Sequence, residues 1–202
     1  MRLCVLDLEM NQPSGNIIQI GAACYGIKQD KIVSTFLETV NPGENLSEYI
    51  IDLTHISQTS VDEARPLDEV ARSFSEWATG VGVGNLLASW GSDYNYLKQR
   101  VPSQYFTWTR FLDLKQMSTV FQAILPSRKG GGLTSQMNKV GLQFEGRQHN
   151  ALTDAINTVV ITTHVISVRT MTSTAWLRSL SRIARYVPSV LQYSRESGEH
   201  HP

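Results

Sequence analysis

The sequence predicts a mixed α/β fold in which helices cover the faces of one central sheet. Two features of the 202-residue chain carry this prediction. Apolar runs joined by short turns fill the first 40 residues, which is typical of an antiparallel meander. After residue 65 the apolar positions recur at helical spacing, and short buried strands alternate with these helices. We therefore expect a five-stranded sheet in which three antiparallel strands come first and parallel strands follow.

The expected strands are runs rich in apolar residues and bounded by turn-forming residues. The segments Pro13-Ser14-Gly15 and Lys28-Gln29-Asp30 separate the first three runs and favour short connections. The last two runs are shorter and lie between helical segments. Strands are expected at residues 3–8, 16–25, 31–40, 85–90 and 110–114.

The expected helices are segments whose apolar residues return every three or four positions. In the first of them, apolar residues recur from Leu67 to Trp77, directly after Pro66, a residue that suits the start of a helix. Helices are expected at residues 67–77, 92–100, 115–125, 133–140 and 150–167.

Residues 169–202 differ from the rest of the chain, so we divide it into a domain of residues 1–168 and a C-terminal tail. The tail contains a basic amphipathic helix that pairs an apolar stripe with a stripe of arginines, and Pro188 kinks or ends it. The arginines face water if this helix packs on the domain. Otherwise they contact nucleic acid or a second subunit, which makes the helix a candidate homodimer contact.

The charge balance limits the classes of function. The 18 Lys+Arg and 18 Asp+Glu side chains cancel, and 41% of the residues are hydrophobic. This composition excludes collagen-like, coiled-coil and wholly disordered chains. Neutrality also disfavours a protein that coats nucleic acid, because such domains are usually basic. The balance conceals two unlike segments, since residues 1–168 hold 13 basic and 16 acidic side chains, whereas residues 169–202 hold 5 and 2.

The two cysteines and the N-terminus indicate the compartment. Cys4 and Cys24 lie in apolar, strand-like runs and are expected to be reduced thiols in the core. Asp7 and Glu9 interrupt the first apolar run, so no signal peptide is expected. No apolar run reaches 18 residues, and we expect a cytoplasmic protein with no membrane span.

The same two acidic residues are the first candidates for chemistry. Asp7 and Glu9 are two positions apart on a strand, so both side chains point to one face. Neighbouring carboxylates in a buried strand repel each other unless a cation lies between them. The alternative is that this end of the strand is exposed to solvent.

Three further candidates lie later in the chain. Asp93 follows the strand at 85–90, where functional groups collect in α/β sheets, although it could also cap the next helix. His149 lies in a polar loop, and Asp154 lies one turn into the following helix. An acidic residue there is also explained by the helix dipole, and a loop histidine by simple exposure.

Together these residues resemble the DEDDh exonucleases, which have the ribonuclease H-like fold. The resemblance covers about residues 3–167 and is closest to the Eri-type and KapD-like branch, which trims 3′ ends of RNA. Asp7-Leu8-Glu9-Met10 also resembles the opening of oligoribonucleases. The local runs that carry the branch resemblance are Asp52-Leu53-Thr54-His55-Ile56-Ser57, Ser89-Trp90-Gly91-Ser92-Asp93, Gly141-Leu142-Gln143-Phe144-Glu145-Gly146-Arg147-Gln148-His149 and Asp154-Ala155-Ile156-Asn157.

The resemblance implies a metal-dependent 3′–5′ exonuclease that acts on the 3′ end of single-stranded RNA or DNA and releases nucleoside 5′-monophosphates. It implies that Asp7, Glu9, Asp93 and Asp154 hold two metal ions and that His149 is the general base. Carboxylate ligands suit Mg²⁺ or Mn²⁺. The alternatives are a DNA proofreading or repair exonuclease of the same fold and a catalytically silent nucleic-acid-binding module.

Six further residues are candidates for substrate binding. The segment at Met10 and Asn11 resembles the part of the family that meets the terminal nucleotide, although Met10 suits the core equally well. His55 replaces a glycine of the family and either narrows the pocket for the terminal nucleotide or stacks on a base. Trp90 is either a neighbour of the site or a core residue. Arg128 and Lys129 lie in a basic, glycine-rich loop that either follows the phosphates or is simply solvated.

Overall fold

The computed structural model describes residues 2–106, 108–117 and 131–170, in two compact units, Met1–Thr162 and Thr163–Pro202. The first unit contains the whole sheet. Arg128, Lys129 and the expected C-terminal helix lie outside the described residues.

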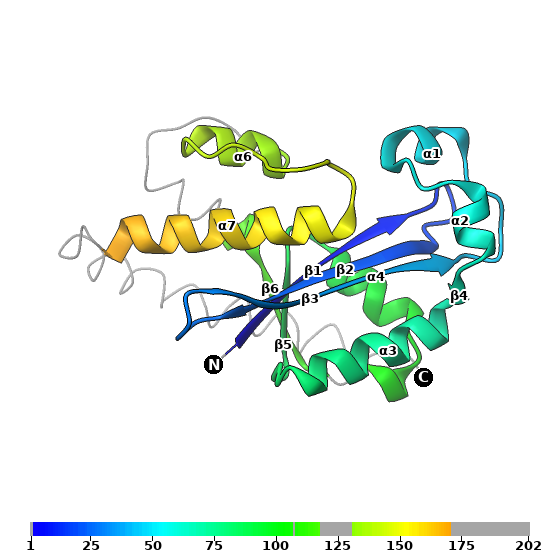
Figure 1. Ribbon diagram of the computed structural model, residues 1–202, viewed down its shortest axis with the longest axis horizontal. Coiled ribbons are helices and arrows are strands. Elements are labelled where there is room, and N and C mark those ends of the chain that lie inside the picture. The colour runs from blue at the N-terminus through cyan, green and yellow to red at the C-terminus, as the bar shows by residue number, and fades with distance from the viewer. Residues whose placement is uncertain (1, 107, 118–130, 171–202) are drawn as a thin grey trace, which may run out of the picture. The chain divides into compact units, whose positions relative to one another are not determined.

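This first unit is built on a six-stranded sheet of order β4-β3-β2-β1-β5-β6 (Figure 1). The first three strands pair antiparallel, and β5 and β6 continue the sheet in parallel beside β1. The five predicted strands and their directions are therefore confirmed. The strands are β1 (Arg2–Met10), β2 (Ile17–Gly26), β3 (Lys31–Asn41), β4 (Arg65–Pro66), β5 (Leu86–Ser89) and β6 (Arg110–Asp113).

The sixth strand, β4, was not predicted. It consists of two residues that pair in parallel with Val40 and Asn41 at the end of β3. So short a strand has no apolar run that a pattern can detect. Pro66 is tolerated because, at the edge of a sheet, its missing N–H breaks no ladder hydrogen bond.

The helices predicted around residues 67–77, 92–100, 133–140 and 150–167 are present, whereas two short α-helices and a 3-10 helix at Ser103–Tyr105 were not predicted. The missed helices α1 and α2 each begin at a serine cap, because Ser47 Oγ accepts from Ile50 N–H and Ser57 Oγ accepts from Ser60 N–H. Residues 114–117 are helical, and the rest of the helix expected at 115–125 lies outside the described residues. The helices are α1 (Glu48–Thr54), α2 (Gln58–Asp62), α3 (Leu67–Gly80), α4 (Asp93–Arg100), α6 (Leu133–Lys139) and α7 (Ala151–Thr170).

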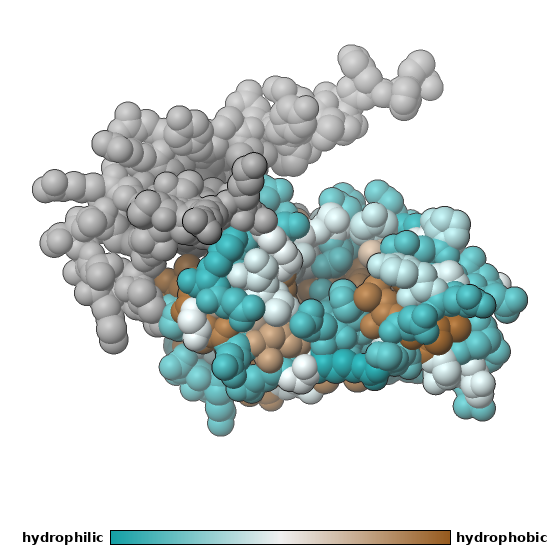
Figure 2. All heavy atoms as spheres, turned by 90° about the horizontal axis from the view of Figure 1, so that it is seen from above, coloured by the Kyte–Doolittle hydropathy of each residue, from teal (hydrophilic) through white to brown (hydrophobic). Residues whose placement is uncertain are grey.

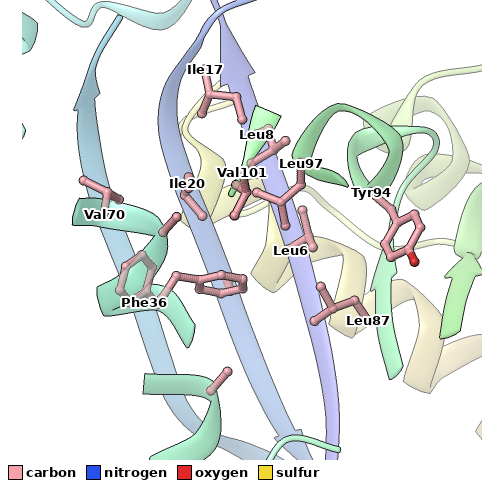
Figure 3. Packing of buried hydrophobic residues seen from close by; sticks show 14 of the residues in the cluster. Leu6, Leu8, Ile17, Ile20, Phe36, Val70, Leu87, Tyr94, Leu97 and Val101 are labelled. Carbon is pink, nitrogen blue, oxygen red and sulfur yellow. The ribbon is translucent and has the colours of Figure 1, made fainter. Parts of the chain in front are cut away.

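The two faces of the sheet are buried by different helices. On one face, side chains of β1, β2 and β5 pack against α3 and α4, as Figure 3 shows for Leu6, Ile20 and Leu97 among others. On the other face, Val5 and Ala23 pack against Ala155 and Val159 of α7. In Figure 1 the yellow α7 crosses this second face of the sheet.

The alternation of β1 decides where its acidic residues point. Cys4, Leu6 and Leu8 belong to the cluster under α3 and α4, whereas Val5 belongs to the cluster under α7. Because side chains alternate along a strand, Asp7 and Glu9 point to the α7 face.

Cys4 and Cys24 face each other in the β1–β2 ladder, and both are buried free thiols, as predicted. Burial raises the pKa of both thiols.

Hydrophilic residues cover most of the coloured surface in Figure 2, and hydrophobic areas lie between them. Among the described residues, no helix combines the length and hydropathy that crossing a membrane requires.

Candidate active site

The carboxylates of β1 lie in surroundings that disfavour their charge. Glu9 is only 7% exposed. Burial, followed by the charges of Asp154 and Asp93, raises the pKa of Glu9 to about 8. Burial and the charges of Asp93, Asp154 and Glu9 also raise the pKa of Asp7 well above its ordinary range. Asp7 is half-buried. The two carboxylates therefore lie beside other acidic side chains, on the one face that their spacing predicted they share.

The loop before α7 brings His149 to this group. His149 has a left-handed backbone conformation with φ of 60°, and its N–H donates a 3.0 Å hydrogen bond to Oδ2 of Asp154. Asn150 caps the helix, because its Oδ1 accepts from the N–H and the hydroxyl of Thr153, each at 3.1 Å. The start of α7 thus fixes the positions of the histidine and the aspartate together.

Asn157 holds the same loop from one helical turn further on. This side chain is 2% exposed, and its Oδ1 accepts from Glu145 N–H at 3.0 Å. Its Nδ2 donates to the carbonyl oxygens of Glu145 at 2.8 Å and Thr153 at 2.9 Å. Asn157 therefore has a structural role. It anchors the segment that leads to His149 by hydrogen bonds.

Asp93 is the first residue of α4, and Ser92, which precedes the helix, makes no side-chain cap hydrogen bond. Burial is the largest cause that raises the pKa of Asp93 to about 7, and the charges of Asp113 and Asp154 contribute. The charge of Asp93 in turn contributes to the raised pKa of Asp7. Asp93 therefore belongs to the acidic group, beyond any role at the helix start.

Asp113 is an acidic neighbour that was not predicted from the sequence. It ends β6 beside Ser89 of β5, and its Oδ1 accepts from Gln116 N–H at 3.0 Å, which caps the helical turn at 114–117. Its position at the end of an expected strand was the one feature of the sequence that could have indicated a place in the site.

The described residues include one group whose ligand atoms are close enough to share an ion. One ligand atom each from Glu9, His149 and Asp154 lies within 4.8 Å of the other two. Asp7 and Asp93 adjoin this group electrostatically. These residues fit a divalent cation, because carboxylate oxygens suit hard ions and because their raised pKa values mean that a positive charge would stabilise the ionised forms.

The predicted substrate residues at the end of β1 have partners inside the protein. Asn11 is 2% exposed, its Nδ2 donates to Glu44 Oε1 and Asn45 O, and its Oδ1 accepts from Ser47 N–H. Its side chain therefore fastens the segment that leads into α1. Met10 is half-buried and packs against the cluster under α3 and α4, which agrees with the alternative that it is a core residue.

His55 and Trp90 have contrasting environments. His55 is exposed and caps α1 in a left-handed conformation with φ of 57°, which explains why a glycine suits this position in the family. Trp90 packs against the cluster that contains Val5 and Ala155, so its ring is part of the core. Its buried Nε1 has no hydrogen-bond partner in the described part of the chain.

Glu9, His149 and Asp154 lie together on the α7 face, and Asp7 and Asp93 adjoin them electrostatically. With the strand order, this is the arrangement of a DEDDh-type exonuclease on a ribonuclease H-like fold. The chain belongs to the exonuclease family, whose model matches residues 4–162.

Two curated relatives are exoribonucleases by name. Human ERI1 exoribonuclease 2 is 26% identical over 194 residues, which cover 79% of this chain and 27% of that protein. Rat 3′-5′ exoribonuclease 1 is 26% identical over 174 residues, covering 77% and 50%. The chain thus spans half or less of the length of these relatives.

The fold is shared with a solved nuclease domain. The nuclease domain of 3′hExo, described as a DEDDh family member bound to rAMP, matches with a TM-score of 0.67 and 23% identity. The match covers 82% of this chain and 92% of that domain.

Proposed function

We propose that the protein is a metal-dependent 3′–5′ exonuclease that shortens single-stranded RNA from its 3′ end and releases nucleoside 5′-monophosphates. The observation that supports this most directly is the convergence of Glu9, His149 and Asp154 within 4.8 Å, on the face toward which Asp7 also points. This combination supplies carboxylate ligands and a titratable imidazole at one place.

In this proposal, Asp7, Glu9, Asp93 and Asp154 hold two Mg²⁺ or Mn²⁺ ions. When bound, two divalent ions would supply positive charge that stabilises the attacking and leaving oxygens of a phosphodiester. The raised pKa values of Glu9 and Asp93 mean that these ligands must lose protons as the site is loaded. The neutral net charge of the chain is compatible with a nucleic-acid substrate, because the ions would provide the charge that the phosphate needs.

His149 is the proposed general base. Its imidazole takes a proton from the attacking water, whose oxygen adds to the phosphorus of the terminal phosphodiester. The bond between phosphorus and the 3′ oxygen of the preceding nucleotide breaks, and that oxygen takes up a proton. The hydrogen bond from His149 N–H to Asp154 Oδ2 supports this role, because it joins the residue to one of the proposed metal ligands.

RNA is the favoured substrate because the curated relatives are named exoribonucleases. A DNA proofreading or repair exonuclease and a catalytically silent binding module are the other outcomes of the same test. Matched 5′-labelled RNA and DNA oligonucleotides, digested with Mg²⁺ and Mn²⁺ separately and also tested for binding by gel shift, distinguish the three. We expect stepwise shortening of RNA in the presence of metal and no shortening by Asp7→Asn. Faster shortening of DNA would favour the repair enzyme, and binding without cleavage would favour the silent module.

A further inference from the structure

We infer that Gln19 is a positioning residue of this site: it holds the N-terminus of α7, and with it His149 and Asp154, at the separation from β1 that metal binding requires. This inference rests on the proposed function, because it assigns a role within the same site.

The contact itself is buried and joins distant parts of the chain. Oε1 of Gln19 accepts a 3.0 Å hydrogen bond from the N–H of Ala151, 132 residues further on. Gln19 is 6% exposed and Ala151 is fully buried. Ala151 is the first residue of α7, where a backbone N–H has no carbonyl partner within the helix. Without Gln19, this N–H would be left unsatisfied in a place that water does not reach easily.

The position of Gln19 in the sheet links the contact to the carboxylates. In the β1–β2 ladder Gln19 pairs with Glu9, and Gly21 pairs with Asp7. Directly paired residues of antiparallel strands share a face of the sheet. The two residues of β2 that stand opposite the two acidic residues of β1 are thus the ones that meet the start of α7.

Gly21 shows how close that approach is. A Cβ at Gly21 would lie 2.2 Å from both the carbonyl carbon of Ala151 and the N atom of Leu152. The absence of a side chain at Gly21 lets the helix backbone lie directly on β2, and the amide of Gln19 fixes it there. Two successive positions of β2 on the α7 face therefore set the height of α7 above the sheet.

The height of α7 determines the geometry of the site. Asp154 lies one turn after Ala151, and His149 lies two residues before it. The ligand atoms of both residues are within 4.8 Å of one another and of that of Glu9, so a movement of the helix start changes these separations directly. Displacements of about 1 Å are enough to reduce catalysis about 100-fold.

Three variants separate positioning from general stability. Gln19→Met keeps the length of the side chain and removes its strong acceptor, and Gln19→Asn keeps the neutral amide but is too short to reach Ala151 N–H. Thr162→Val is the matched control, because Thr162 is equally buried on α7 and its hydroxyl donates a 2.7 Å hydrogen bond to Thr158 O, two turns beyond Asp154. For each variant we would measure Mn²⁺ affinity of the metal-free protein by calorimetry, kcat and KM on single-stranded RNA, and Tm.

We expect Gln19→Met to weaken Mn²⁺ binding and to lower kcat, each by about 10-fold or more, while KM changes less than about twofold. Gln19→Asn should show losses of similar size, because it also leaves Ala151 N–H without its acceptor. Thr162→Val should lower Tm and leave Mn²⁺ affinity and kcat within about twofold of the wild type. If Gln19→Met does not fold, Gln19→Asn replaces it, because its shorter side chain cannot reach Ala151 N–H.

A folded Gln19→Met or Gln19→Asn with wild-type Mn²⁺ affinity and kcat would overturn the inference. Equal losses in Thr162→Val would overturn it too, because they would show a general effect of stability. A wild-type protein that binds Mn²⁺ but cleaves no nucleic acid would contradict the proposed function, and the Mn²⁺ affinities of the variants would still decide the role of Gln19.

Discussion

The N–H of His149 donates a hydrogen bond of 3.0 Å to Oδ2 of Asp154, so the proposed base and a proposed metal ligand are joined through the backbone. The bond closes a turn at the start of α7 in which His149 has φ of 60°. Removal of the Asp154 carboxylate is therefore expected to move His149, whereas a change of the His149 side chain leaves the backbone donor in place.

Replacement of His149 tests the general base without disturbing this turn. Asparagine tolerates the left-handed conformation, so His149→Asn should fold with a Tm close to that of the wild type. Loss of a general base should lower kcat by about 10²–10⁴-fold. Steady-state kinetics on RNA measure the change, and a folded variant with wild-type kcat would show that another group removes the proton.

The stability of the metal-free protein should fall as the pH rises from about 5 to about 8.5. Glu9 has an ordinary pKa of 4.5 and a folded-state pKa of about 8. Between these values the folded protein binds more protons than the unfolded chain, so increasing pH favours unfolding. We expect Tm to fall by on the order of 5–10 °C across this range, as measured by thermal denaturation in a chelator.

Two controls accompany this pH series. Glu9→Gln should reduce the dependence, because an amide at position 9 does not ionise, whereas Asp7 and Asp93 still contribute. Addition of Mn²⁺ should restore Tm most strongly at high pH, where the carboxylates are free of protons. A Tm that rises over the same range would contradict the raised pKa values at the site.

Gly21→Ala should reduce activity far more than a glycine-to-alanine change elsewhere. A Cβ at this position lies 2.2 Å from the backbone of α7, so the helix must move away from β1. We expect a loss in kcat of about 100-fold. Gly80→Ala at the end of α3 is the matched control, since a Cβ there has no heavy atom within 4 Å in the described structure. Similar activity of the two variants would mean that α7 is not held by its contact with β2.

His55→Gly should stabilise the protein by about 1 kcal/mol, because glycine has no penalty in the left-handed conformation that His55 adopts. Chemical denaturation measures this gain. If His55 also contacts the substrate, KM of the more stable variant will rise, and an unchanged KM would remove His55 from the substrate-binding residues.

Much of the fold could be predicted because its signals are local. Long apolar strands, the helical period from Leu67 onward and the acidic positions of β1 all lie in short stretches of sequence. The helices α1 and α2 have seven and five residues, too few for a clear period. Their placement depends instead on serine caps and on Asn11, which holds the segment before α1 from the end of β1.

The site residues were predictable as residue types, whereas the contacts that position them were not. Gln19 offered one signal, a polar residue within the apolar run of β2, but its partner lies 132 residues away. Asn157 was visible in a motif, and only the fold shows that it bonds both backbone groups of Glu145. Both contacts depend on how α7 packs on the sheet, which no local pattern encodes.

Exonuclease activity at this site is tested most directly by a time course on a 5′-labelled single-stranded RNA with Mn²⁺, comparing the wild type with Asp7→Asn. We predict a ladder that shortens one nucleotide at a time from the 3′ end and no ladder for Asp7→Asn. Chromatography of the same reaction should show unlabelled nucleoside 5′-monophosphates as the released products. An RNA that stays intact, is cut internally, or is degraded equally by both proteins would contradict the proposed activity.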